Sequence, residues 1–535
     1  MSVREHSSAR RAAVVGMLGL AALAALAARV PARSAAPAVL AVADRAAYAQ
    51  IYRPQVHFTP VRHWMNDPNG LVYFDGWYHL FFQYNPDGAR WGNMSWGHAV
   101  SRDLLHWRQL PVAIPQGRRH MIFSGSAVVD WHDSSGFGVA GRPPLVAIYT
   151  AAPRGMPGPQ TQNLAYSTDG GWHWRKYAGN PVLNIGLRDF RDPKVFRYAA
   201  GHDWVMVVSR AAERRVSFYV SGDLKTWKHT GDFGPAGDTR GVWECPDLFE
   251  LPVGNRPGER RWVLKVDVQP HRPGTGGGGQ VFIGRFNGRT FSAISPKAQP
   301  IDLGEDYYAS ASWSNLPAAG PGVITLGWMD NWLYAQSAPT APWRGAMAFP
   351  RALSLLRQGA TYRLIQRPIA ALATLRGASR RLGPFLAPTA LRVLTVPAQG
   401  AAHEIQARID VGRRGRFVLT IGSSDGRQVR LGYDAQAGQF TLRRLGQYRF
   451  SPKFDSDNAA PLATLHGAIA LNLIIDRSSV EAFVNHGTLT AAETFYARGG
   501  AYTVTVRTTR ARVERMRIWR LRSIWRNGAP RGVPP

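Results

Sequence analysis

A chain of 535 residues, 45% hydrophobic and 11% aromatic, can bury a large core and exceeds one ordinary domain, so we expect two domains. Its single cysteine, Cys245, excludes an internal disulfide, and the 15 histidines show no zinc-binding spacing, so neither a metal nor a cofactor is expected. The formal net charge of +30 does not indicate nucleic-acid binding, because Lys and Arg are spread along the chain and rarely cluster.

The N-terminus has the pattern of an export signal. Arg4, Arg10 and Arg11 precede an Ala-rich apolar run, Ala12 to Ala28, which is short for a bilayer span of about 20 residues. We expect a cleaved signal within residues 1–49 and a secreted or periplasmic protein with no stable membrane insertion after cleavage. The adjacent Arg10 and Arg11 leave the twin-arginine route open, and an uncleaved anchor is the alternative.

Residues 50–364 are expected to form an all-β domain. The apolar run from Leu71 to Tyr84 is split by Asp75-Gly76, a strong hairpin signal, and similar short strands continue to about residue 356. One motif recurs three times, as Ser101-x-Asp103 with Trp107, Ser167-x-Asp169 with Trp174, and Ser221-x-Asp223 with Trp227. This period suits propeller blades of four short strands better than a sandwich.

A second domain follows a connector. Ile365 to Leu375 is the best candidate for a short helical connector, within a linker over residues 365–379. Strand-like runs at sandwich-like spacing then predict a β-sandwich over residues 380–526 and a tail over 527–535; these runs include Phe417 to Ile421, Leu471 to Ile475 and Val480 to Val484. Arg515 to Trp519 alternates basic with apolar residues, like a final edge strand with one solvated face.

Two short motifs suggest other chemistry but lack its structural context. Gly274-x-Gly276-x-x-Gly279 matches a dinucleotide fingerprint, yet the strand-like residues 280–283 follow it where that motif needs a helix. Gly422-x-Ser424-x-Gly426 matches a nucleophile elbow, yet Asp425-Gly426 between two strand-like runs indicates a hairpin. Neither a dinucleotide enzyme nor a serine hydrolase follows.

Three acidic residues stand beside prolines, flanked by strand-like runs. Asp67 lies in Trp64-Met65-Asn66-Asp67-Pro68-Asn69-Gly70, Asp192 in Arg191-Asp192-Pro193-Lys194, and Glu244 in Trp243-Glu244-Cys245-Pro246-Asp247. Taken singly, the first is also a good ordinary turn, and either of the others could be a surface ion pair.

Taken together and in this order, the three segments resemble the carboxylate motifs of glycoside hydrolase family 32, the invertase, inulinase and levanase family. Further segments resemble the family in sequence: Phe123–Ala127, Asp306–Ala309, Ala311–Trp313, Gly327–Trp332, Trp343–Met347 and, in the second domain, Asp476–Glu481. The resemblance implies a five-bladed β-propeller with a funnel-shaped site on its axis, joined to a β-sandwich.

The resemblance also implies roles. Asp67 would be the nucleophile, Glu244 the general acid and then base, and Asp192 a transition-state stabiliser that hydrogen-bonds the fructosyl hydroxyls. Such a pair suits the reaction, because one carboxylate attacks the anomeric carbon while a protonated one supplies the leaving oxygen with a proton. Family membership implies retention of configuration, which predicts Asp67 and Glu244 carboxyls roughly 5 to 5.5 Å apart. Whether Cys245 tunes this environment or only packs stays open.

By the same match, seven residues would contact the fructosyl unit: Asn66, Gln83, Trp91, Phe123, Ser124, Arg191 and Trp313. Arg191 would donate in a fixed fork, and the aromatic residues would wall the pocket. For Trp91 and Trp313 the alternative is packing within a blade, since most of the 18 tryptophans must serve the core. Tyr307 departs from the family, which has phenylalanine there, and would add a hydroxyl near the pocket rim.

The implied function is that of a secreted β-fructofuranosidase releasing terminal fructosyl residues from levan- or inulin-type fructans and sucrose. Gly327–Trp332 and Trp343–Met347 look closest to the exo-acting levanase and inulinase branch. The alternatives are a sucrose-restricted invertase, a non-catalytic fructan-binding protein and, third, an arabinan-cleaving hydrolase. The expected partner is the sugar substrate, with no nucleic acid, and the oligomeric state stays open. The high positive charge adds the hypothesis of retention on anionic surfaces or polymers.

Overall fold

The computed structural model describes residues 48–525 except 156, 202, 271–276, 318–321 and 447. The predicted tail and all but the last two residues of the export segment lie outside the described residues. Strands dominate the rest, as expected: the described residues contain one α-helix, α1 (Leu372–Leu375), and the short 3₁₀ turns η2 (Ala211–Glu213), η3 (Ala335–Ser337), η4 (Asn485–Gly487) and η5 (Arg498–Gly500). No helix in the described ranges has the length and hydropathy to cross a bilayer.

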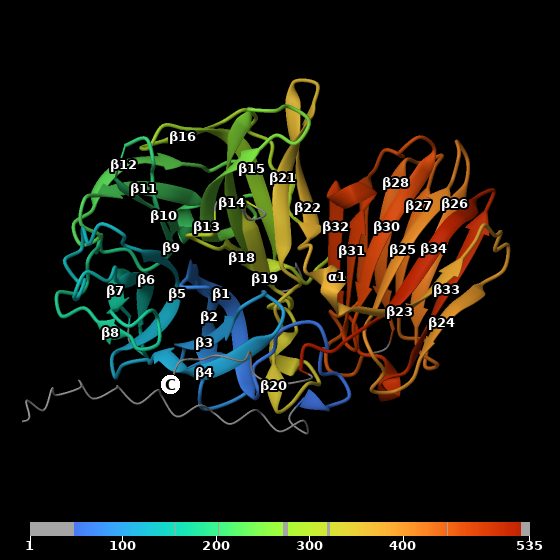
Figure 1. The fold of residues 1–535 in the computed structure, drawn as a ribbon, viewed down its shortest axis with the longest axis horizontal. Coiled ribbons are helices and arrows are strands. Elements are labelled where there is room, and N and C mark those ends of the chain that lie inside the picture. The colour runs from blue at the N-terminus through green and yellow to red at the C-terminus, as the bar shows by residue number, and fades with distance from the viewer. Residues whose placement is uncertain are drawn as a thin grey trace, which may run out of the picture. The chain divides into compact units, whose positions relative to one another are not determined.

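Five sheets follow one another along the chain (Figure 1). The first contains β20 (Trp343–Arg344), β1 (His63–Phe74), β2 (Trp77–Asn85), β3 (Ser95–Ser101) and β4 (Trp107–Ile114), and the second contains β5 (His120–Val129), β6 (Leu145–Pro153), β7 (Thr161–Ser167) and β8 (Arg175–Lys176). The third contains β9 (Phe190–Arg197), β10 (Trp204–Arg210), β11 (Arg215–Ser221) and β12 (Lys228–Phe233).

The fourth sheet contains β13 (Gly241–Pro252), β14 (Arg260–Pro270), β15 (Gly278–Phe286), β16 (Phe291–Ala293) and β17 (Gln299–Pro300), and the fifth β18 (Tyr308–Ser312), β19 (Ile324–Trp328), β21 (Arg351–Gln358) and β22 (Thr361–Pro368). The first strands of the five sheets touch in a ring, β1 to β5 to β9 to β13 to β18 and back to β1. β20 pairs in parallel with β1, with His63 opposite Trp343, so a late segment completes the first blade. This arrangement is the expected five-bladed propeller.

The repeated Ser-x-Asp motif forms the same turn in three blades. In the first, the Asp103 carboxylate accepts the N–H groups of Leu105 and His106, and the Trp107 indole donates to the Leu104 carbonyl at 3.1 Å. The other two copies make equivalent bonds between the third and fourth strands of their blades. The repeat therefore does mark blades.

All five inner strands interrupt their regular pairing at the level of the predicted site residues. The interruptions fall at Met65–Pro68, Ile122–Gly125, Arg191–Lys194, Glu244–Asp247 and Tyr308–Ala311. Asp192 and Cys245 have positive φ angles of 66° and 48°, which L-residues seldom adopt. A bulge bends its strand and changes where the following side chains point, so these five segments leave the ordinary alternation of the sheet.

The connector between the domains is shorter than expected. Ile365 belongs to β22, where it pairs with Ser354 of β21, and the helix is confined to α1. The sequence-based helix over Ile365 to Leu375 was therefore wrong in its first half, because pairing with a neighbouring strand decided the local conformation. At the N-terminal side, Tyr48 stacks on Trp525 with ring centroids 3.9 Å apart, so Tyr48 belongs to the fold and not to the export segment.

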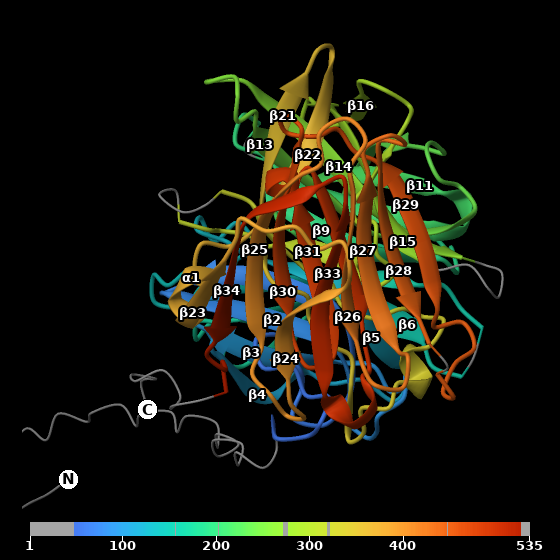
Figure 2. The same ribbon diagram turned by 90° about the vertical axis from the view of Figure 1, so that its right-hand side faces the viewer.

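Two six-stranded sheets form the sandwich (Figure 2). One has the order β23 (Arg376–Leu382), β34 (Arg512–Leu521), β25 (His403–Asp410), β30 (Ala468–Ile475), β31 (Ser479–Val484) and β32 (Leu489–Thr494). The other has the order β24 (Leu391–Val396), β33 (Tyr502–Thr509), β26 (Arg416–Gly422), β27 (Gln428–Asp434), β28 (Gln439–Leu445) and β29 (Ser456–Pro461). Their shared core includes Ile405, Leu419 and Val504.

The alternation of Arg515 to Trp519 is confirmed, but its expected place in the sheet is not. Met516 and Ile518 lie in the sandwich core, whereas Arg515 is exposed. β34 is not an edge strand, because β23 pairs with its outer side. β23 comes from a distant part of the chain, and the local pattern of β34 carries no information about such a partner.

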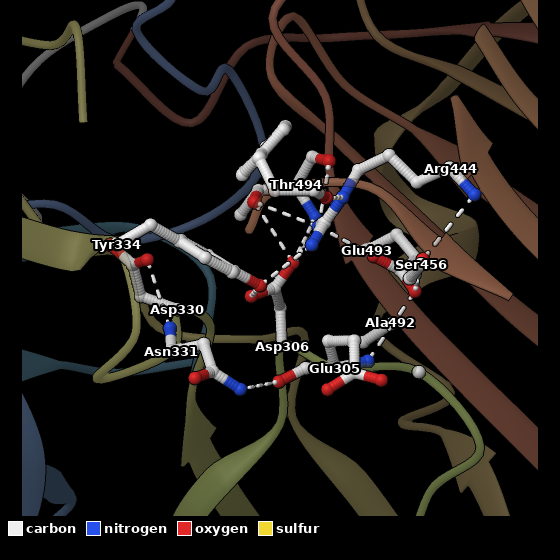
Figure 3. Close-up of polar contacts among 12 residues, drawn as sticks. Glu305, Asp306, Asp330, Asn331, Tyr334, Arg444, Ser456, Ala492, Glu493 and Thr494 are labelled. Carbon is white, nitrogen blue, oxygen red and sulfur yellow. Dashed lines mark hydrogen bonds and ion pairs between the residues drawn. The ribbon is translucent and has the colours of Figure 1, made fainter. Parts of the chain in front are cut away.

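A buried charge network joins the fifth blade to the sandwich (Figure 3). Arg444 of β28 lies 2.5 Å from Asp306 and 2.5 Å from Glu493, and it donates to the Tyr334 hydroxyl at 2.8 Å. Asp306 also accepts the backbone N–H of Thr494 at 2.7 Å. One arginine thus faces two carboxyl groups; burial, with the Asp306 charge adding to it, raises the pKa of Glu493 to about 8 against the opposing effect of Arg444.

A second buried network makes stability depend on pH. His57 lies between Asp476, 2.8 Å from its Nδ1, and Glu481, 3.1 Å from its Nε2. Burial disfavours the imidazolium, but hydrogen bonds to both carboxylates outweigh burial and raise the pKa of His57 to about 9. A histidine with a raised folded-state pKa contributes stability that is complete below its unfolded pKa of about 6.5 and is lost as pH rises through 9.

We therefore expect the His57 contribution, about 3 kcal/mol of unfolding free energy, to vanish between pH 6.5 and 9. Urea unfolding at fixed ionic strength measures it, with His57→Gln as the reference lacking the titration. The raised pKa values of Asp192, Asp267 and Glu493 also make stability fall with pH, from about pH 4 up to about 7 or 8, so the difference between the two proteins isolates His57. Parallel stability curves for the two proteins would contradict the assignment.

Candidate active site

The structure brings the three predicted carboxylates together. Asp67 lies in β1, Asp192 in β9 and Glu244 in β13, all at interrupted points of inner strands. The Cys245 thiol lies 3.7 Å from Asp67 Oδ2 and 3.6 Å from Asp192 Oδ2, and the Cys245 N–H donates to Asp192 Oδ2 at 2.9 Å. Cys245 thus contacts two of the three carboxylates and does more than fill space.

Asp67 is held by two short hydrogen bonds. Asn66 Nδ2 donates to its Oδ1 at 2.8 Å and Ser124 Oγ donates to its Oδ2 at 2.7 Å, while the Trp64 indole fixes Asn66 at 2.7 Å. Burial raises the pKa of Asp67, and the nearby Glu244 charge adds to this; the two hydrogen bonds act in the opposite direction. Both oxygens are oriented before any ligand arrives.

Glu244 is held by different partners. Arg191 Nε donates to its Oε1 at 2.9 Å and the Tyr308 hydroxyl donates to its Oε2 at 2.6 Å. The Gln269 amide, oriented so that its nitrogen donates, lies 3.0 Å from Oε2. The side chain of Glu244 is 14% exposed, so this carboxyl stays accessible while its position is fixed.

Asp192 lies at a strained point of its strand. Its N–H donates to the Thr150 hydroxyl at 2.9 Å, which stabilises the positive φ angle. Burial, and then the Glu244 charge, raise the pKa of Asp192 to about 7, with Arg191 opposing them. Beneath it, Lys265 donates to the Cys245 carbonyl at 2.8 Å, so a buried cation supports the bulge that carries Glu244.

Three further predicted residues lie on segments next to those of the carboxylates: Trp91 and Phe123, which pack together, and Gln83 of β2. The Trp91 and Phe123 rings meet edge to face at 6.0 Å, and Trp91 is 38% exposed, which argues against blade packing for Trp91. Gln83 is buried, and its amide nitrogen has no hydrogen-bond partner among the described residues. An unsatisfied buried donor is costly unless a ligand or a water molecule accepts its hydrogen bond.

Trp313 is not among these groups, which corrects the prediction for that residue. Its indole donates to the His79 carbonyl at 3.1 Å and its ring lies parallel to Trp107 in the core of the first and fifth blades. Trp332 takes the place at the site: it stacks on Trp64 at 5.9 Å and belongs to a cluster containing Tyr308, Phe123 and Cys245. Tyr308, Gln269 and Trp332 were missed from the sequence.

Tyr307 is also placed differently from the expectation. It is buried beneath the guanidinium of Arg351, which lies 3.7 Å above its ring, and its hydroxyl is 3.5 Å from the Thr325 hydroxyl. The extra oxygen is therefore satisfied inside the fifth blade and not at the pocket rim. Among the described residues, no group of three or more His, Cys, Asp or Glu side chains is arranged to hold a metal ion.

The three carboxyl groups have different hydrogen-bond donors. Asp67 is oriented by neutral donors, Glu244 by a guanidinium and a phenol, and Asp192 by a backbone N–H. Two carboxyl groups in different environments can divide nucleophilic and proton-transfer work between them. A third beside them can accept hydrogen bonds from a bound hydroxylated ligand.

Comparison with known proteins agrees with this geometry. Residues 57–368 match the family model for the N-terminal domain of glycosyl hydrolases family 32, and residues 371–520 match its C-terminal model. The extracellular exo-inulinase of Aspergillus awamori is 36% identical over 528 residues, covering 89% of this chain and 96% of that protein. Its crystal structure aligns with a TM-score of 0.83 at 35% identity, over 89% of this chain and 100% of that one.

Two further relatives have other names. The levanase of Bacillus subtilis (strain 168) is 44% identical over 454 residues, which are 83% of this chain and 66% of that longer protein. Invertase 1 of Saccharomyces cerevisiae is 40% identical over 310 residues, 57% of this chain and 58% of that protein. With both domain models matched in order and three carboxylates gathered at the propeller axis, this chain belongs to glycosyl hydrolases family 32.

Proposed function

We propose that this protein is a secreted β-fructofuranosidase that hydrolyses terminal β-D-fructofuranosyl residues with retention of configuration. The observation that carries the proposal is the separate hydrogen-bonded support of Asp67 and Glu244 at one level of the ring. Membership of family 32 and the names of the levanase, exo-inulinase and invertase relatives support it. The extracellular relative supports the export expected from the N-terminal pattern.

The proposed reaction has two steps. Asp67 attacks the anomeric carbon of the fructosyl unit and forms an ester, while the protonated Glu244 gives its proton to the departing glycosidic oxygen. Glu244 then takes a proton from water, which attacks the same carbon and releases fructose and the Asp67 carboxylate. Asp192 accepts hydrogen bonds from fructosyl hydroxyls, which strengthen as positive charge builds on the ring.

Fructans are the proposed main substrates, attacked from the chain end. Trp91, Phe123 and Trp332 would wall one fructosyl unit, and Gln83 and Asn66 would bond its hydroxyls. Similarity to the levanase and exo-inulinase over most of the chain supports this. Restriction to sucrose is the second candidate, favoured by the 40% identity of the yeast invertase over 310 residues.

Fructose release from levan, inulin and sucrose by the full chain tests the proposal. Free fructose as the first product from either polymer supports exo-action, and cleavage of sucrose alone supports the invertase alternative. Asp67→Asn should abolish release from every substrate. A wild-type protein that binds fructan but releases no fructose would exclude the hydrolase assignment.

We expect Ser124→Ala to move the acid limb of kcat/KM upward by roughly 0.5 to 1 pH unit. Asp67 must be ionised to attack, so activity falls as pH drops through its raised pKa. Losing the Ser124 hydroxyl removes a bond that favours the carboxylate, which raises this pKa further. Ser167→Ala, whose hydroxyl bonds Asp169 in a distant turn, is the matched control. If the acid limb does not shift in Ser124→Ala, Ser124 does not influence the ionisation of Asp67.

A further inference from the structure

A groove of about 840 Å³ lies away from the catalytic carboxylates, between the end of β22 with α1 and the outer face of the β23–β34–β25–β30 sheet. Figure 2 shows α1 beside β23, β34 and β25. None of its lining residues belongs to the site described above. The lining contains six arginines and no Asp or Glu: Arg367, Arg376, Arg381, Arg408, Arg515 and Arg517. Its size is that of a ligand-binding site, and its chemistry is strongly cationic.

Strand register sets these arginines side by side. Arg381 of β23 lies directly opposite Arg517 of β34, and Arg515 of β34 lies directly opposite Arg408 of β25. Their faces are fixed by the core, because Met516, Ile518 and Ala407 between them point into the sandwich. Like charges directly opposite each other in an antiparallel sheet are destabilising.

Few carboxylates relieve this repulsion. Arg376 pairs with Glu404 and Arg408 pairs with Glu514, each at 2.6 Å. Among the described residues, no carboxylate pairs with the other four arginines of the groove: Arg367, Arg381, Arg515 and Arg517. A bound anion would supply the missing charge.

We propose that this groove binds a phosphate-bearing polymer. Guanidinium groups recognise phosphate and carboxylate oxygens in a planar fork. Inside such a polymer each phosphate keeps two non-bridging oxygens on a tetrahedral phosphorus, so two facing guanidinium groups can each donate to it from a different side. Several such groups along one chain would meet Arg381, Arg517 and Arg515 in turn.

A nucleic acid fits less well. Single-stranded nucleic acids need aromatic faces on which bases stack. The one tryptophan of the groove, Trp519, is 6% exposed, and the guanidinium groups of Arg376 and Arg517 lie 4.6 and 4.5 Å from its ring centroid. Phe483 of the lining is buried as well, which leaves the imidazole of His486 as the one exposed ring of the groove. The groove therefore offers strong charge with little surface for stacking.

Calorimetric titration of the full chain with inorganic polyphosphate at one fixed ionic strength tests the proposal. Arg381→Gln with Arg515→Gln should weaken binding at least about tenfold, whereas Arg430→Gln with Arg443→Gln, exposed arginines opposite each other in the other sheet, should change it less than about twofold. Fructose release should be unchanged in both variants. Polyphosphate should also raise the melting temperature of the wild type more than that of the groove variant, which shows independently that both are folded.

Four outcomes would overturn the proposal. If both double variants weaken binding equally, the net charge of the protein alone explains the binding. Equal or tighter groove-dependent binding of polygalacturonate would replace phosphate by carboxylate as the ligand class, and tighter binding of single-stranded DNA would make the site one for nucleic acid. Absence of polyphosphate binding by the wild type would exclude the site altogether.

Discussion

Replacing Glu244 with glutamine is expected to lower kcat for fructan or sucrose by about 10²- to 10⁴-fold, with KM changed far less. Glutamine keeps the size of the side chain and can still meet Tyr308, but it has no proton to give to the leaving oxygen. A substrate with an acidic leaving group, such as an aryl fructofuranoside, needs less protonation, so its first step should be much less impaired.

The same variant allows a second, independent measurement. Without a general base, water attacks the fructosyl–Asp67 ester slowly, whereas azide needs no deprotonation, so azide should accelerate turnover of the aryl substrate by Glu244→Gln. Glu250→Gln is the matched control, because Glu250 lies on the same strand in an exposed pair with Arg260 at 2.7 Å. Equal losses on both substrates and no azide effect would remove Glu244 from the acid–base role.

Replacing Arg444 with methionine is expected to lower the unfolding free energy by roughly 3 to 5 kcal/mol, since it leaves Asp306 and Glu493 buried without their cation. Arg443 provides a control on the neighbouring position, because its pair with Asp457 is exposed and contributes about 0 to 1 kcal/mol. Urea unfolding of Arg444→Met and Arg443→Met measures the difference. Equal losses in the two variants would contradict the importance of the buried network.

The Arg444 variant should also lose activity while still folded. Asp306 lies two residues before Tyr308, which donates to Glu244, and the Asn331 amide beside Trp332 donates to the Glu305 carbonyl at 2.8 Å. The sandwich thereby anchors two segments that reach the catalytic site. At a temperature below the melting range of both variants, turnover by Arg444→Met should fall below that of Arg443→Met.

Much of the fold could be predicted because its signals are local. The Asp75-Gly76 hairpin joins β1 and β2 as expected, with Phe74 opposite Trp77. The repeated turn of Asp103 and Trp107 has its own hydrogen bonds and needs no distant partner. The order of strands within a sheet was harder to predict, since the pairing of β34 with β23 depends on residues far apart in the chain.

The aromatic side of the site shows where sequence reasoning failed. Trp313 and Trp332 both follow family-like strand segments, and nothing in their spacing tells which one reaches the carboxylates. The irregular pairing between Tyr308 and Ala311 interrupts the regular alternation of side chains in β18, so spacing alone does not tell which residues of this segment reach Glu244. The carboxylates were predictable because their flanking residues identify the family, whereas a bulge has no comparable local signature.

The five interrupted inner strands have a consequence for evolving or engineering this protein. Each interruption gives up regular ladder hydrogen bonds, and at Asp192 and Cys245 it also holds L-residues at unfavourable backbone angles. Changes that regularise these strands would raise the thermal stability of the protein and, at the same time, remove the pocket. Heat-tolerant variants that keep their turnover should therefore carry their substitutions in outer strands, loops and the sandwich, and leave the innermost strand of every blade unchanged.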